Sequence, residues 1–173
     1  MKVLETGRLS LRWLTADDAP FMLGLLNEPS FIENIGDRGV RTVEGARQYI
    51  EKGAVTSYHQ NGYGLYMVEM KGDGTPVGIC GLVKRPFLEH ADIGFAFLPP
   101  FWSQGYALES ASAVMDFARN RLSLERIVAI VSPGNEPSIR LLRKLGLEFE
   151  RMIEMPTPGD TAALYVPVSS AAS

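Results

Sequence analysis

The sequence has little cysteine and histidine and no excess of positive charge. Its one cysteine, Cys80, excludes an internal disulfide and a multi-cysteine zinc site, and its two histidines, His59 and His90, form no ligand cluster. Lys and Arg together number 17 against 20 Asp and Glu, which gives a net charge of −3. A protein that binds a nucleic-acid backbone is expected to carry a basic excess. We therefore predict neither a metal ion nor a nucleic acid as a direct partner.

Long hydrophobic runs are also absent. No stretch approaches 18 uninterrupted apolar residues, which is the signature of a membrane-spanning helix. The first seven residues have no apolar core of the kind that a signal peptide carries. These absences predict a cytoplasmic protein with no membrane partner.

A length of 173 residues and a hydrophobic fraction of 46% are typical of one soluble domain. No linker or internal repeat divides the chain. The densest turn sequence, residues 71–76, lies between two strand-like runs and predicts a hairpin. We predict a single domain over residues 1–168, followed by a frayed tail of small and polar side chains at residues 169–173.

Hydrophobic patterns predict seven strands and four helices along the chain. The strands are expected at residues 9–14, 62–70, 77–83, 90–98, 126–131, 147–155 and 163–168. The helices are expected after Thr15, after Thr42, from Gly105 to about Asn120, and after Asn135. Strand–helix–strand connections make part of such a sheet parallel. The predicted fold class is α/β, with a mixed central sheet of about seven strands and helices on both faces.

One segment combines features that suit an anion. Residues 91–109 predict a strand, a short proline-marked loop and a glycine-containing turn into a helix. The first turn of a helix leaves N–H groups unpaired and carries partial positive charge, and Gly105 has no side chain to keep an anion away from them. The chain has neither a G-x-G-x-x-G nor a G-x-x-x-x-G-K-[ST] phosphate loop. Taken alone, this segment favours an ordinary strand-to-helix turn.

Three motifs together are more specific than that segment alone. The opening T-x-R-L-x-L-R is present at residues 6–12. A run of the form I-G-Y-x-L-x-P-x-x-W-G-K-G-Y-A-T-E-A is matched at residues 93–98 and 102–109, and N-x-x-S with K-L-G-F is matched at residues 135–138 and 144–147, where Leu147 replaces Phe. In this order the motifs resemble the GNAT N-acetyltransferases, specifically their RimJ/RimL-like branch. The order of strands and helices predicted above is also the GNAT order.

The resemblance implies an acetyl-coenzyme A site in a V-shaped split of the sheet. The pantetheine arm is expected to pair with main-chain groups of Phe97 and Leu98, as an added strand does. The side chain of Asn135 would hydrogen-bond the pantetheine region, and Ser138 would lie near the sulfur. The amides expected to hold the pyrophosphate are those of Gln104, Gly105, Tyr106, Ala107 and Leu108.

Acetyl transfer needs a group that takes a proton from the acceptor ammonium and a group that gives one to the departing thiolate. By the resemblance, Asp92 is the candidate base, with Glu89 and His90 as runners-up. The alternative role for Asp92 is that of a solvated strand residue or a partner for a neighbouring loop. Ser138 is the candidate acid. Its amide is also expected to donate to the side chain of Asn135 in a helix cap, and the two roles are compatible.

The thioester carbonyl also needs hydrogen-bond donors as it gains negative charge. The N–H groups of Phe95 to Phe97 are the expected donors, provided that a bulge frees one of them from the sheet. Many GNAT enzymes use a tyrosine acid on the helix that follows the asparagine. No tyrosine lies between Asn135 and Leu164, so that mechanism is not expected here.

The resemblance implies a metal-independent N-acetyltransferase whose acceptor is a protein α-amine, as on a ribosomal protein, or a small-molecule amine. It leaves the assembly open, with a homodimer as one option. The acidic residues Glu28, Glu33 and Asp37 would suit a cationic acceptor, although a solvated loop is the other interpretation. The alternative function is a non-catalytic acyl-CoA-binding module that acts as a sensor or assembly partner, because several residues compete for the role of base and the tyrosine acid is missing.

Overall fold

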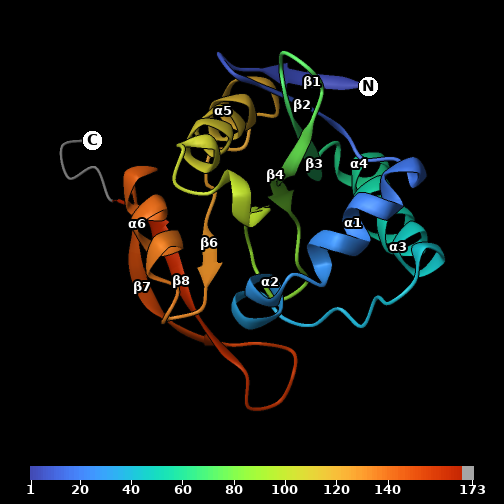
Figure 1. The fold of residues 1–173 in the computed structure, drawn as a ribbon. Helices are drawn as coiled ribbons and strands as arrows, with labels where there is room; N and C mark the ends of the chain where they lie inside the picture. Colours follow the sequence, from blue (N-terminus) through green and yellow to red (C-terminus); the bar gives the residue numbers. More distant parts are fainter. Residues whose placement is uncertain (169–173) are drawn as a thin grey trace.

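The computed structural model describes residues 1–168, which form eight strands in two antiparallel sheets (Figure 1). The five-stranded sheet has the strand order β1-β2-β3-β4-β5 and the three-stranded sheet the order β6-β8-β7. The strands of the first are β1 Lys2–Glu5, β2 Leu9–Trp13, β3 Leu65–Met70, β4 Pro76–Val83 and β5 Asp92–Phe97. Those of the second are β6 Ala129–Val131, β7 Leu147–Glu154 and β8 Thr161–Pro167.

Six α-helices accompany these strands within the described residues: α1 Ala19–Leu26, α2 Pro29–Asn34, α3 Val43–Ile50, α4 Thr56–Asn61, α5 Tyr106–Arg121 and α6 Glu136–Lys144. Short 3-10 turns precede α1 and α5, and a π-helical turn, Glu51–Val55, joins α3 to α4. The predicted helices correspond to α1, α3, α5 and α6. The helix predicted after Thr42 is α3, and Thr42 caps it by accepting a hydrogen bond from the Gly45 amide at 2.9 Å.

The two sheets meet at a single point, where β5 begins and β6 is about to begin. Asp92 and Val128 form an isolated parallel bridge; the Ile93 amide donates to the Val128 carbonyl at 2.9 Å, and the Val128 amide donates to that of Ala91 at 3.0 Å. Beyond this bridge β6 pairs only with β8. The predicted parallel connection through α5 is therefore present, and the V-shaped split that the resemblance implies divides the strands into two sheets that diverge from a common apex.

A second contact joins the two halves away from the apex. The Ser132 hydroxyl, just after β6, donates to the carbonyl of Asn34 at the end of α2, at 2.9 Å. In Figure 1, α2 accordingly lies close to the end of β6, although the two segments are distant in sequence. The angle between the sheets is thus bounded at its apex by strand pairing and at this side by α2.

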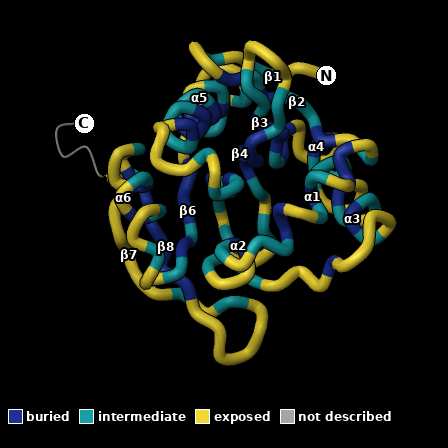
Figure 2. Tube along the Cα trace, viewed as in Figure 1, coloured by how far each residue is buried: buried dark blue, intermediate teal, exposed yellow. Residues whose placement is uncertain are grey.

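The two larger parts of the hydrophobic core lie on the two faces of the five-stranded sheet (Figure 2). One part is covered by α5 and continues under α6 and the three-stranded sheet. The other is covered by α1 and α3. Cys80 lies in β4 with no exposed surface, and burial raises the pKa of its thiol to about 12, which fits a packing residue rather than a reactive one.

The sequence patterns missed three elements. The short edge strand β1 and the helices α2 and α4 were not predicted, and each has only four to six residues. The tail predicted to be frayed, residues 169–173, lies outside the described residues.

Candidate active site

The edge of β5 that faces β6 is open beyond the apex. The register of β4 and β5 runs without a shift, and the Leu98 amide donates to the Val77 carbonyl of the β4 side at 3.0 Å. In an antiparallel pair, alternate residues direct their main-chain groups toward the partner strand and away from it. Ile93, Phe95 and Phe97 therefore face away from β4. Only Ile93 pairs with the β6 segment, so the groups of Phe95 and Phe97 line the diverging space.

Leu98 already has partners for its main-chain groups. Its amide donates to Val77, and its carbonyl accepts from the Phe101 amide at 2.9 Å. Phe97 directs its main-chain groups away from β4, and its carbonyl accepts a hydrogen bond from the indole of Trp102 at 2.7 Å. Phe95 and Phe97 therefore face the diverging space, and Leu98 does not.

No bulge interrupts β5. Residues 92–97 pair in unbroken register with β4, and the N–H group of Ala96 faces that strand. The Phe95 N–H is directed away from β4 without any bulge, because β6 has already diverged at this point. A donor for a carbonyl oxygen is therefore available from the strand edge itself.

The turn that opens α5 has the geometry of an anion site. Gly105 is the N-cap residue with a φ of 84°, and no side chain caps the helix. The Glu109 amide donates to the Gly105 carbonyl at 2.9 Å, so the amides of residues 106–108 precede the first bond of the helix and have no intrahelical acceptor. The Gln104 side chain turns back to the Pro100 carbonyl at 3.0 Å. The predicted phosphate-binding residues 104–108 thus lie together in one turn.

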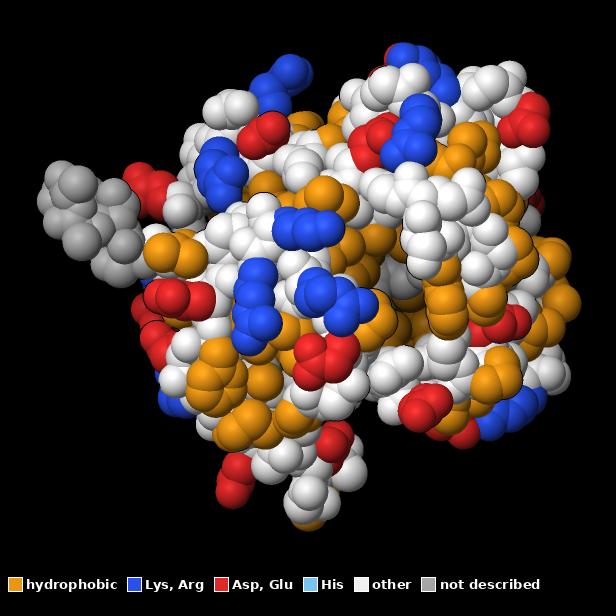
Figure 3. Space-filling model, turned by 60° about the vertical axis from the view of Figure 1, so that its left-hand side comes forward, with side chains coloured by type: hydrophobic (Ala, Val, Ile, Leu, Met, Phe, Trp, Pro, Cys, Tyr) orange, Lys and Arg blue, Asp and Glu red, His pale blue; other side chains and the backbone are white. Residues whose placement is uncertain are grey.

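A recess is visible on the face of the molecule drawn in Figure 3. Hydrophobic side chains line it, and several Lys and Arg side chains gather on one side of it. On α6, the exposed basic side chains are those of Arg140, Arg143 and Lys144. A positively charged rim of this kind raises the local concentration of anionic ligands.

Asn135 and Ser138 lie together at the start of α6. The Asn135 side-chain oxygen accepts from the Ser138 amide at 3.4 Å, which is the predicted cap. Pro137 has no N–H group, so the Ser138 amide is the donor within reach of the cap. The half-buried Ser138 hydroxyl is not part of that bond and stays free for another role.

Asp92 lies at the apex and is almost fully enclosed. Its side chain is 2% exposed and forms an ion pair with the Arg85 guanidinium, with Nε 2.9 Å from Oδ1. Burial raises the pKa of Asp92 to about 6, and the attraction of Arg85 offsets only part of that effect. Arg85 lies in the loop after β4, so this ion pair matches the alternative role predicted for Asp92, that of a partner for a neighbouring loop. The raised pKa of Asp92 also lies near the range that suits a general base.

The runners-up for the base lie at the surface. The His90 ring nitrogen is 3.8 Å from the carboxylate of Glu89, whose side chain is 89% exposed. His90 lines a shallow cavity of about 490 Å³ together with Tyr63 and Arg126. Of the acidic residues considered for acceptor binding, Asp37 is exposed and paired with Arg41 at 2.6 Å.

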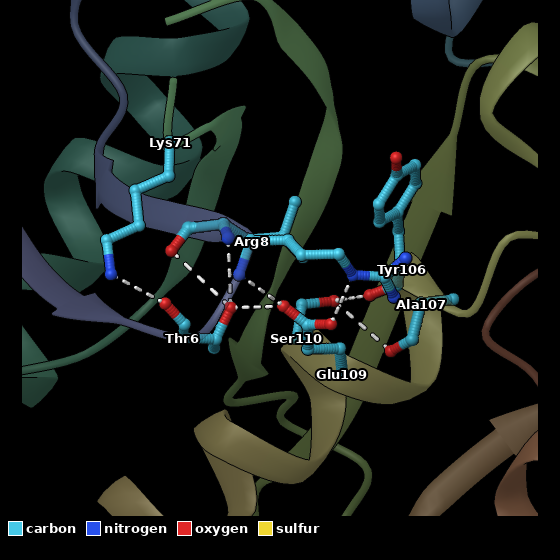
Figure 4. Close-up of polar contacts among 8 residues, drawn as sticks. Thr6, Arg8, Lys71, Tyr106, Ala107, Glu109 and Ser110 are labelled. Carbon is cyan, nitrogen blue, oxygen red and sulfur yellow. Dashed lines mark hydrogen bonds and ion pairs between the residues drawn. The ribbon is translucent and has the colours of Figure 1, made fainter.

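A network that sequence analysis did not assign joins the N-terminal motif to α5 (Figure 4). The Glu109 carboxylate accepts from the Thr6 hydroxyl, from the Arg8 amide at 3.0 Å and from the Arg8 Nε at 2.7 Å. The Arg8 guanidinium lies over the Tyr106 ring, 4.5 Å from its centroid. Burial alone would raise the pKa of Glu109, but the hydrogen bonds from Thr6 and Arg8 hold it below its ordinary value. The sequence did contain a signal for this network, because Thr6, Arg8, Tyr106 and Glu109 all lie in the motifs at residues 6–12 and 102–109.

The model of the acetyltransferase (GNAT) domain family matches residues 8–148 of the chain. The chain belongs to the GNAT acetyltransferase family. The uncharacterized N-acetyltransferase YoaA of Bacillus subtilis is 30% identical to it over 166 residues, which cover 92% of this chain and 93% of YoaA. As a GNAT member the protein is an acetyl-CoA-dependent N-acetyltransferase, and this favours the enzyme over the non-catalytic module considered as its alternative.

Solved structures agree with the fold of this GNAT acetyltransferase. An acetyltransferase from Agrobacterium tumefaciens superimposes with a TM-score of 0.81 at 23% identity, covering 98% of this chain and 95% of its own. RimL, a ribosomal L7/L12 α-N-protein acetyltransferase in complex with coenzyme A, gives a TM-score of 0.79 at 20% identity, with 97% and 98% covered.

Two features are absent from the described part of this GNAT chain. No helix in residues 1–168 is long and apolar enough to cross a membrane. In the same residues, no group of three or more His, Cys, Asp and Glu side chains could hold a metal ion.

Proposed function

We propose that the protein binds acetyl-CoA along the open edge of β5 and transfers the acetyl group to a primary amine by direct attack on the thioester. The observation that supports this most strongly is that Phe95 and Phe97 direct main-chain groups into the space between the sheets, while β5 leads directly to the α5 turn. The pantetheine arm pairs with these groups, and the amides of residues 106–108 hold the pyrophosphate. Asn135 contributes to the pantetheine site.

Three groups would supply the chemistry. Asp92 accepts the ammonium proton through a bridging water, because its carboxyl is nearly enclosed, with a pKa raised to about 6 by burial. The Phe95 N–H donates to the thioester oxygen as its negative charge grows. Ser138 donates a proton to the thiolate, since its hydroxyl takes no part in the helix cap.

The acceptor that we propose is either the α-amine of a protein, as expected for the RimJ/RimL-like branch, or a small-molecule amine. Two neighbours of the same fold carry such names: RimL is titled a ribosomal L7/L12 α-N-protein acetyltransferase, and AAC(6')-Ib is described in complex with paromomycin and acetyl-CoA. The exposed Glu33 on α2 would contribute negative charge near the Ser132–Asn34 contact. A cationic acceptor fits that charge.

The first test is thermal unfolding with acetyl-CoA, coenzyme A, ATP or NAD, each at about 1 mM. A ligand at about 100 times its dissociation constant adds about 2.7 kcal/mol of stability, which is a rise in Tm of roughly 5–10 °C for a chain of this size. A rise with both coenzyme A forms and with neither nucleotide is the expected result. No rise with either form contradicts the proposed site.

The second test identifies the acceptor. Release of free thiol from acetyl-CoA is followed with a library of polyamines, aminoglycosides and peptides that carry free α-amines. Turnover with members of one class is the expected result. Thiol release at the uncatalysed rate with every amine, from a protein that binds coenzyme A, would refute amine acetylation as the reaction.

A further inference from the structure

The turn proposed to bind the pyrophosphate is held from outside by the N-terminal strands. Arg8, at the connection between β1 and β2, reaches across to α5. Its Nε donates to Glu109, one turn into the helix, and its guanidinium stacks on Tyr106, the first helical residue. Its terminal nitrogen Nη2 also lies 3.2 Å from where a Cβ on Gly105 would stand. One side chain therefore contacts Tyr106 and Glu109 and lies beside Gly105.

The charge of Arg8 is unusual for its position. A helix N-terminus carries partial positive charge, which normally favours an acidic neighbour over a cation. Glu109 supplies the acid, and it accepts from both the side chain and the main chain of Arg8. The charges of Arg8 and Glu109 therefore cancel near the helix N-terminus. Their hydrogen bonds link the first turn of α5 to the β1–β2 connection. The planar guanidinium suits this double task, because it stacks and donates at once.

We propose that Arg8 is a positioning residue for the pyrophosphate-binding turn, acting through Gly105, Tyr106 and Glu109. This rests on the proposed acetyl-CoA site. By fixing the turn before the ligand arrives, Arg8 reduces the ordering cost of binding. Arg8 therefore raises affinity for ligands that carry the pyrophosphate and leaves affinity for the pantetheine arm unchanged.

The test compares two probes on the same variants. Coenzyme A carries the pyrophosphate, and pantetheine has the same arm without it. Calorimetric titration gives the dissociation constant of each for the wild-type protein, Arg8→Gln and Glu109→Gln. We expect each substitution to weaken coenzyme A binding about tenfold, the size of one charge-assisted hydrogen bond, and to leave pantetheine binding within twofold. Arg8→Lys keeps the charge without the planar fork, and we expect it to restore only part of the affinity.

Arg12→Gln is the matched control. Arg12 belongs to the same motif and is ion-paired with Asp18 and Glu69, at 2.8 and 3.1 Å, away from α5. Arg12→Gln should lower the thermal stability of the protein without changing the ratio of the dissociation constants for coenzyme A and pantetheine. If Arg8→Gln weakens both probes equally, or neither, the positioning role is overturned although the acetyl-CoA site stands. If the wild-type protein binds no coenzyme A, the proposed function itself fails, and the inference fails with it.

Discussion

Substituting Gly105 by alanine tests the α5 turn directly. With a φ of 84°, Gly105 has a left-handed conformation that costs a side-chain-bearing residue about 1–2 kcal/mol. The added Cβ would also stand 3.2 Å from a terminal nitrogen of Arg8, which has to move by a few tenths of an ångström. For a domain of this length, 1 kcal/mol corresponds to about 2–4 °C, so the expected fall in Tm is roughly 2–8 °C. The shifted turn should also bind coenzyme A several-fold more weakly.

Gly159→Ala is the control that separates strain from ligand binding. Gly159, between β7 and β8, has a φ of 82° and open space where a Cβ would be placed. It should lose similar stability, measured by thermal unfolding, with no change in the dissociation constant for coenzyme A measured by calorimetry. Equal coenzyme A affinity of the two variants would refute our placement of the pyrophosphate at the α5 turn.

Three other substitutions test the proposed chemistry. Burial raises the pKa of Asp92 to about 6 from an ordinary 3.8, so the folded protein binds this proton more tightly than the unfolded chain. Urea unfolding at each pH gives the free energy of unfolding of the wild-type protein and of Asp92→Asn. The wild-type value relative to that of the variant should fall by up to about 3 kcal/mol as the pH rises from 4 to 6, and should not change below pH 4. The same variant should lose at least 100-fold in turnover, while wild-type turnover rises through pH 6; a flat pH profile would count against the base. Ser138→Ala leaves the amide cap intact, so Tm should stay within about 2 °C while turnover falls about 100-fold; unchanged turnover would exclude Ser138 as the acid. Trp102 is 48% exposed and bonded to the Phe97 carbonyl, so coenzyme A should change the tryptophan fluorescence, and Trp102→Phe should abolish that change; a persisting signal would argue against pairing at Phe97.

Much of the fold followed from local patterns, because its longer elements carry their own signals. The cap at Thr42, the cap at Asn135 and the left-handed Gly146 after α6 each satisfy a helix end with residues close in sequence. The division into two sheets could not be predicted from such local patterns. It depends on β6 turning away from β5 after one bridge, and the hydrophobic periodicity within either strand carries no information about that divergence.

The candidate site also has features that local sequence predicts and features that depend on tertiary contacts. The turn at residues 104–108 could be predicted, since a glycine before a helix is a local feature. The pairing of Asp92 with Arg85 and that of Glu109 with Arg8 could not, because each partner is brought in by tertiary packing. The orientation of Leu98 could not be predicted for a related reason. Which alternate residues face the gap depends on the register with β4, and that register is fixed by pairing between strands.

The open edge of β5 also bears on how this protein avoids self-association. An unpaired strand edge on a protein surface is a template on which another chain can add a strand and begin to aggregate. Here the main-chain groups of Phe95 and Phe97 face the second sheet of the same molecule, between the Asp92–Val128 bridge and the Ser132–Asn34 contact, and the Phe97 carbonyl accepts from Trp102. The edge is therefore turned inward, and this orientation limits its use as a template for strand addition by another chain.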